Sequence, residues 1–155
     1  SRGRISGPFS VLLNSPEVAG RSAHLGAYLR FESILENRVL ELAIITAARE
    51  MDCDYEWAYH ALLAKKAGVP ESVIDLVNRR SDTKDIPLEF ANVIQYTREL
   101  LNRKKVGQKT FNQISNQFGT QGTTELTAAI GYYGMLACAL NAFEIMPEEG
   151  TPELF

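Results

Sequence analysis

Apolar residues recur at helical spacing along almost the whole chain, and this periodicity constrains the fold more than any other feature. Residues at i, i+3, i+4 and i+7 lie on one face of a helix, whereas a half-buried strand alternates strictly. Strand-like alternation between turn signals is scarce in this sequence. We therefore expect an all-α fold. Because 155 residues with 45% hydrophobic content fit one ordinary domain, we expect a single domain over residues 1–155.

Cap and turn signals divide the chain into about seven helical segments. Ser33 and Glu36 are spaced as in a capping box, and Asp52 and Asp54 suit the first turn of the next helix. Residues 1–14 and 147–155 lie outside these segments and are expected to be extended arms. The expected helices run over about 16–31, from 33 through 45, over about 52–68, briefly from 70, and over about 87–103, 109–118 and 123–145.

The charge pattern and the spacing of the two cysteines limit the classes of partner that the protein is expected to bind. Sixteen basic and nineteen acidic residues give a net charge of −3, and no run of Lys or Arg forms the footprint of a nucleic-acid binder. The uncharged run 126–143 contains Gly, Tyr, Thr and Asn, which is typical of a buried core helix rather than a membrane span. Cys53 and Cys138 lie outside any metal-binding spacing. We expect a cytoplasmic protein without a metal, nucleic acid or membrane as partner.

One stripe of the helix expected over about 52–68 combines four different functional groups. At about 100° per residue, Cys53, Glu56, Trp57 and His60 fall on the same side. A plain packing face would be aliphatic, and a plain solvent face would seldom carry Trp and Cys beside charges. The preceding helix holds Glu41 in an otherwise apolar segment, where a buried carboxylate needs a partner. A hairpin of the two helices would bring Glu41 against His60.

Structural roles are open for several of these residues as well. Glu56 and His60 also fit an ordinary i, i+4 pair on a half-exposed helix. Tyr132 and Tyr133 fit aromatic residues of a core or an interface. Cys138 lies between apolar neighbours and fits a small buried hydrophobe. These alternatives stand beside the catalytic interpretation of the stripe.

The spacing of Glu41, Cys53, Glu56 and His60 resembles the helix pair that characterises the carboxymuconolactone decarboxylase and AhpD-like family. In the AhpD-type peroxidases of that family, a glutamate lies twelve residues before the first cysteine of Cys-x-x-Cys, and a histidine follows the second cysteine by four. Glu41, Cys53 and His60 take three of these places, and Glu56 stands in the place of the second cysteine. The resemblance extends to residues 7–9, 26–32 and 118–133, and it implies an AhpD-like helical bundle.

Glu56 shifts the expected chemistry from peroxide reduction to acid–base catalysis. A dithiol peroxidase needs a second thiol to resolve the oxidised first one, and a carboxylate cannot do this. The resemblance then implies a decarboxylase-like enzyme without a redox pair or organic cofactor, acting on a small carboxylated lactone or related cyclic acid. We expect His60 to transfer the proton and Glu41 or Glu56 to fix its tautomer. The alternatives are a thiol peroxidase using Cys53 and a non-catalytic interaction module.

Further residues are candidates for binding the small-molecule substrate or a second subunit. An arginine is expected to hold the substrate carboxylate, and Arg30, Arg38 and Arg49 are all close in sequence to the expected pocket. Trp57 is expected at an apolar wall or a subunit interface, and Tyr133 is another substrate-binding candidate. The resemblance also implies a homo-oligomer, a trimer or a hexamer, which a monomeric mass in light scattering would contradict.

Overall fold

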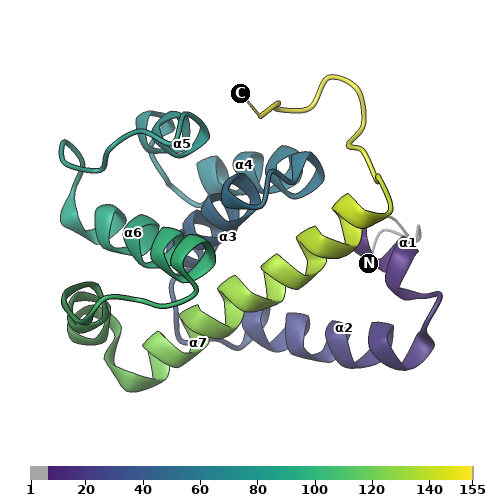
Figure 1. Cartoon of the computed structure of the whole chain (residues 1–155), viewed down its shortest axis with the longest axis horizontal. Helices are drawn as coiled ribbons and strands as arrows, with labels where there is room; N and C mark the ends of the chain where they lie inside the picture. Colours follow the sequence, from purple (N-terminus) through teal and green to yellow (C-terminus); the bar gives the residue numbers. More distant parts are fainter. Residues whose placement is uncertain (1–6, 155) are drawn as a thin grey trace.

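Seven α-helices and their loops make up residues 7–154, the part of the chain that the computed structural model describes (Figure 1). These described residues contain no strand, so the all-α prediction is confirmed. The helix α7 runs across the molecule, with α2 along one side of it and α3, α4 and α6 on the other. The helices are α1 (Pro8–Leu12), α2 (Pro16–Phe31), α3 (Asn37–Glu50), α4 (Asp54–Lys66), α5 (Glu71–Asn78), α6 (Leu88–Arg103) and α7 (Gln108–Ala142).

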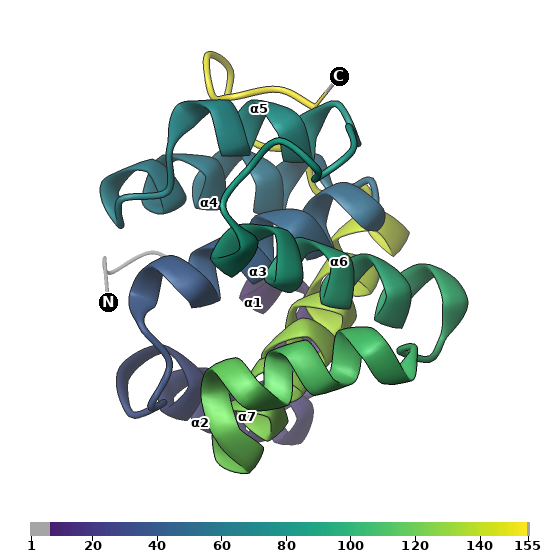
Figure 2. The same ribbon diagram turned by 90° about the vertical axis from the view of Figure 1, so that its left-hand side faces the viewer.

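The helix α3 forms the centre of the fold. It packs against α4, α5, α6 and α7, and Figures 1 and 2 show these helices around it. Its residues Leu42, Ala43 and Ile45 have no solvent exposure. Burying a large apolar side chain stabilises a fold by about 1.5–3 kcal/mol, so the apolar segment around Glu41 is drawn into the core. The same packing carries the Glu41 carboxylate into the interior, where it is 4% exposed.

A kink at Gly119 joins two segments that the sequence predicts as separate helices. The expected helices over about 109–118 and 123–145 form one element, α7, and Gly119 has φ 69° and ψ −178° within it. Only glycine adopts such a positive φ without a steric penalty. Gly119 therefore lets the chain bend without a separate loop. The portion of α7 beyond the bend presents Tyr132 and Tyr133 to the interior.

Glu125 of α7 fastens the loop between α2 and α3. Its Oε2 accepts hydrogen bonds from Ser33 Oγ (2.6 Å) and the Ile34 N–H (2.9 Å), and its Oε1 accepts one from Tyr28 Oη (2.7 Å). Gln121 donates a further bond to Oε1. Burial alone would raise the pKa of Glu125, but the bonds from Ser33, Gln121 and Tyr28 lower it to about 2. The ionised carboxylate thus holds the chain that leads into α3.

This contact explains why the predicted capping box is wrong. The helix α3 begins at Asn37 with Glu36 as its N-cap residue, and no side chain caps it. Ser33 Oγ donates to Glu125 and accepts a bond from the Leu35 N–H. Its hydroxyl is therefore used by the loop rather than by the first turn of α3.

We expect Glu125→Ala to lower the free energy of unfolding by about 2–4 kcal/mol at pH 7, since it leaves several donors without an acceptor. The folded pKa of about 2 lies below the ordinary 4.5, so this stabilisation is present above pH 4.5 and is lost as the pH falls toward 2. Urea denaturation at pH 7 and pH 3 measures both effects. The control Glu17→Ala removes an exposed ion pair with Arg21 and should change stability by less than about 0.5 kcal/mol.

The N-terminal end of the chain differs from the expected extended arm, whereas the described part of the C-terminal end contains no helix. Part of the expected arm over 1–14 is helical, because Pro8 occupies the first turn of α1, where proline is favourable. Residues 1–6 and Phe155 lie outside the described residues. Residues 147–154 form no helix and return toward α5 (Figure 1). There the Asn78 side chain donates a hydrogen bond of 3.1 Å to the Glu153 carbonyl, and Leu154 packs against the core.

Trp57 lies in the core rather than at a pocket wall or an interface. Its side chain is 2% exposed and packs within the main apolar cluster, which corrects both expectations for this residue. The large exposed apolar side chains include Val18, Leu25 and Phe31 on α2. Among the described helices, none is long and apolar enough to cross a bilayer. The association of several copies stays a prediction.

Candidate active site

A cavity of about 680 Å³ opens between α1, α2, α4 and α7, and we call it the His60 cavity. Its charged lining residues are Arg30 from α2 and Glu56 and His60 from α4. The rest of the wall is mainly apolar or aromatic. The aromatic lining residues are Phe9, Phe31, Tyr55, Tyr59, Tyr132 and Tyr133.

Glu41, His60 and Glu56 form a buried row of three charged groups, as the sequence predicts for Glu41 and His60. His60 Nδ1 lies 2.7 Å from Glu41 Oε2, and His60 Nε2 lies 3.3 Å from Glu56 Oε2. The i, i+4 spacing on α4 places Glu56 beside His60, and the packing of α3 on α4 places Glu41 on the other side. The three residues are only 4–6% exposed. Both ring nitrogens of His60 therefore face carboxylates.

The two carboxylates determine the charge of His60. Burial alone would lower the pKa of His60, but the hydrogen bonds with Glu41 and Glu56 outweigh burial and raise it to about 9. At neutral pH the ring is an imidazolium, and each of its N–H groups points to one carboxylate. His60 can therefore pass a proton to either neighbour. Both ring nitrogens are occupied by these carboxylates, so neither is left to contact a substrate.

Glu56 is the member of the row that lines the cavity and has an oxygen without a partner. Its Oε1 is buried and has no hydrogen-bond partner among the described residues. Glu56 and His60 both line the His60 cavity, whereas Glu41 lies behind His60 and does not. A buried polar atom without a partner costs about 1–3 kcal/mol, and a hydrogen bond from a molecule bound in the cavity would remove this cost.

Aromatic rings enclose the row on the cavity side. The Tyr133 ring lies edge-on to His60 with centroids 5.1 Å apart, and Tyr132 lies edge-on to Tyr133 at 5.3 Å. Tyr55 and Tyr59 stack on each other at 4.8 Å. Burial raises the pKa of both Tyr132 and Tyr133. Their phenols are therefore neutral hydrogen-bonding groups rather than bases, and Tyr133 lines the cavity as the sequence suggested.

Gly26 lets Tyr132 approach α2. A Cβ atom on Gly26 would lie 2.3 Å from Tyr132 Oη, so an alanine forces the ring to move. We expect Gly26→Ala to lower the free energy of unfolding by about 1–3 kcal/mol and to weaken ligand binding in the cavity. Gly20→Ala on the same helix is the matched control, because nothing lies within 4 Å of its Cβ position.

Chemical denaturation of both variants tests this role of Gly26. Alanine is the better helix former by about 1 kcal/mol, so Gly20→Ala should be neutral or stabilising. Equal stabilisation of the two variants would show that Tyr132 does not need the space above Gly26.

Neither cysteine faces the His60 cavity. Cys53 precedes α4, is fully buried and packs against Ala137 and Leu140. Burial raises the pKa of its thiol to about 11. Cys138 is exposed, which corrects the expectation of a buried residue, and both thiols are free. The wall of the cavity thus carries the Glu56 carboxylate at the position of the second cysteine in the AhpD-type pattern.

The three candidate arginines lie in three different places. Arg30 lines the exposed part of the His60 cavity. Arg49 does not line it and is corrected as a substrate ligand, because its buried guanidinium donates to the Asn78 carbonyl (2.5 Å) and pairs with Asp52. These contacts tie the end of α3 to α5. Only Arg30 of these three is placed to bind a molecule beside Glu56.

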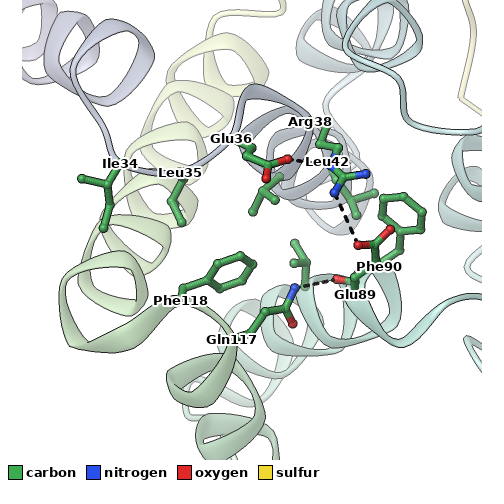
Figure 3. A pocket seen from close by; sticks show the side chains of 11 residues that line it. Ile34, Leu35, Glu36, Arg38, Leu42, Glu89, Phe90, Gln117 and Phe118 are labelled. Atoms are coloured by element: carbon green, nitrogen blue, oxygen red, sulfur yellow. Dashed lines mark hydrogen bonds and ion pairs between the residues drawn. The ribbon is translucent and has the colours of Figure 1, made fainter.

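Arg38 lies in a second hollow of about 390 Å³, which we call the Arg38 cleft (Figure 3). Its guanidinium pairs with Glu36 (2.8 Å) and Glu89 (3.4 Å), and Gln117 donates to the Glu89 carbonyl. The Arg38, Glu36 and Glu89 side chains are 38–69% exposed. Since its charged groups are solvated and already paired, this cleft is a weaker candidate site than the His60 cavity.

The predicted stripe lacks two tyrosines and a leucine that α4 contributes to the cavity wall. Glu56, Tyr59, His60 and Leu63 are spaced i, i+3, i+4 and i+7, so a helical stripe centred on His60 would have included Tyr59 and Leu63. Tyr55 is one turn before Tyr59.

No group of three or more His, Cys, Asp or Glu within residues 7–154 is arranged to hold a metal ion.

A comparison with protein-family models matches part of the chain to a known family. The model described as the carboxymuconolactone decarboxylase family matches residues 16–98, more than half of the 155 residues. The matched segment contains Arg30, Glu41, Glu56 and His60, whereas the tyrosines from α7 lie beyond it. A comparison with curated proteins gave no match.

Proposed function

The chain belongs to the carboxymuconolactone decarboxylase family, and from this membership and the site geometry we propose an acid–base enzyme that uses no redox pair or organic cofactor. Its proposed substrate is a carboxylated lactone or a related cyclic acid. The observation that carries the proposal is the buried row Glu41–His60–Glu56, whose last member lines the cavity and has an oxygen without a hydrogen-bond partner among the described residues. Buried, coupled groups of this kind are typical of acid–base sites.

In the proposed reaction, Glu56 rather than His60 contacts the substrate. The bond between the ring carbon and the carboxylate breaks, its electron pair moves into the conjugated lactone carbonyl, and carbon dioxide leaves. His60 passes its Nε2 proton to Glu56, and Glu56 gives that proton to the carbanion carbon. Glu41 holds the other ring nitrogen and acts as a positioning residue. A proton from solvent restores the imidazolium.

Arg30 has an electrostatic role in this scheme. The substrate keeps one negative charge throughout, because the charge moves from the carboxylate to the carbonyl oxygen as carbon dioxide forms. A guanidinium offers five donors in a fixed plane and binds either oxyanion. Stabilisation of the developing enolate oxygen by Arg30 contributes more to the rate than binding of the substrate carboxylate does. The reason is that the negative charge on the enolate oxygen grows in the transition state.

The two alternative functions have less support. A thiol peroxidase needs an accessible thiolate, whereas Cys53 is fully buried, lies outside the cavity wall and has a raised pKa. A non-catalytic module would be favoured by a pocket filled with side chains. The His60 cavity is open, with a volume of about 680 Å³, and its buried acid has a free oxygen.

Carbon dioxide release from a panel of carboxylated lactones and cyclic acids tests the proposed function. We expect His60→Ala and Glu41→Gln to lower kcat by about 100-fold or more, because the proton supply to Glu56 is interrupted. Cys53→Ala is the control that separates the two enzyme functions and should keep most of the activity. Unchanged turnover in both His60→Ala and Glu41→Gln would overturn the mechanism, and peroxide reduction lost in Cys53→Ala would favour the peroxidase.

A further inference from the structure

We infer that the His60 cavity takes a flat molecule of two or more rings with a single anionic group at one end and a proton donor at the other. The donor is a hydroxyl or an acidic C–H group. This inference rests on the proposed function, because it names the substrate class of the same site. It follows from the order of charged groups along the cavity, from its aromatic wall and from its volume.

The charged groups give the cavity two unlike ends. Arg30 is exposed, whereas Glu56 is 4% exposed, so the cation lies at the outer end and the carboxylate at the buried end. Behind Glu56, the imidazolium of His60 is matched by two carboxylates, which leaves the row with a net charge of −1. Like charges repel strongly at low solvent exposure. A second anionic group on the ligand would therefore be rejected at the buried end.

The buried end of the cavity instead favours a ligand group that donates a hydrogen bond. Oε1 of Glu56 has no partner among residues 7–154 and can only accept a hydrogen bond while the carboxylate is ionised. A ligand hydroxyl supplies such a bond. An acidic C–H group placed there is in position to exchange its proton with Glu56.

The wall between the two ends favours flat rings. Tyr55 and Tyr59 from α4 and Tyr132 and Tyr133 from α7 all line the cavity, and burial keeps the last two phenols neutral. Aromatic faces and edges of this kind pack well against other planar rings. Leu63 and Leu136 add apolar surface. A strongly hydrated polyanion gains little from such a wall.

The volume sets the size of the molecule. Cavities that enclose drug-sized ligands measure about 300–1,000 Å³, and the His60 cavity has about 680 Å³. A single-ring lactone would leave much of the aromatic wall in contact with water. Two or three linked or fused rings would cover more of that wall.

Fluorescence titration with four simple probes tests the inference on the full chain at pH 7.5. The probes are a hydroxynaphthoate, the corresponding naphthalene dicarboxylate, naphthol and hydroxybenzoate. We expect the hydroxynaphthoate to bind roughly tenfold or more tightly than each of the other three, since every comparison removes one recognised feature. Glu56→Gln should abolish the penalty against the dicarboxylate, and Arg30→Gln should weaken the hydroxynaphthoate without affecting naphthol.

Arg38→Gln is the matched control, because it removes a guanidinium from the Arg38 cleft and should leave every affinity unchanged. Equal or tighter binding of the dicarboxylate or of hydroxybenzoate would overturn the inference. So would the absence of binding by all four probes, or a loss of binding in Arg38→Gln but not in Arg30→Gln. The expected ranking without carbon dioxide release from any cyclic acid would refute the proposed function and leave the inference about the ligand standing.

Discussion

Replacing Glu56 with glutamine should lower kcat for decarboxylation by about 10²–10⁴-fold while leaving the fold intact. Glutamine has nearly the same size and keeps an amide oxygen that can accept a hydrogen bond from His60 Nε2, but an amide cannot deliver a proton to carbon. KM should change much less than kcat, since the volume and the aromatic wall of the cavity are kept. Steady-state kinetics together with circular dichroism measure the two effects.

An exposed carboxylate provides the control for Glu56. Glu36→Gln removes an ion pair with Arg38 in the Arg38 cleft, and the Glu36 side chain is 69% exposed. This variant should keep the activity of the native protein. A kcat of Glu56→Gln equal to that of Glu36→Gln would show that another group supplies the proton.

Glu41→Gln should have the largest effect on stability among the site variants. It removes the carboxylate 2.7 Å from His60 Nδ1, and the buried imidazolium then has one carboxylate instead of two. The pKa of His60 should fall below about 9, and the free energy of unfolding at pH 6 should fall by about 3 kcal/mol. NMR titration of His60 and denaturation in urea measure the two quantities.

The pH dependence of this loss has a definite sign. The folded pKa of His60, about 9, lies above its ordinary value of 6.5. Protonation of His60 therefore stabilises the fold fully below pH 6.5, and this stabilisation is lost as the pH rises from 6.5 to about 9. The difference between the native protein and Glu41→Gln should shrink over that range. A difference that grows with pH would mean that His60 is neutral in the folded protein.

The expected hairpin of two helices correctly predicted the contact between Glu41 and His60, whereas the helical period assigned too many residues to one face of α4. Cys53, Glu56, Trp57 and His60 fall within one stripe, yet α4 lies between the core and the cavity. Cys53 and Trp57 therefore face buried apolar clusters, whereas Glu56 and His60 face the cavity. Tertiary packing determines which residues of the stripe face the core and which face the cavity. The spacing of residues along a single helix does not specify this packing.

Contacts between residues far apart in the sequence explain the other differences between the predictions and the structure. Ser33 bonds to Glu125, which is 92 residues away, and this contact replaced the expected capping box. Arg49 bonds to the carbonyl of Asn78 across 29 residues, and this contact removed it from the candidate ligands. Local spacing contains no information on either partner. By contrast, the i, i+4 pair of Glu56 and His60 is a local feature and was predictable from the sequence.

Hydrogen–deuterium exchange at the acidic carbon of a bound lactone is the most direct measurement of proton transfer by Glu56. A lactone without the carboxyl group, incubated with the protein in deuterium oxide and followed by NMR, reports this step without requiring decarboxylation. We predict that the native protein exchanges the carbon-bound proton and that Glu56→Gln binds the same lactone without exchanging it. Equal exchange rates in the two proteins would contradict the assignment of Glu56 as the group that transfers the proton.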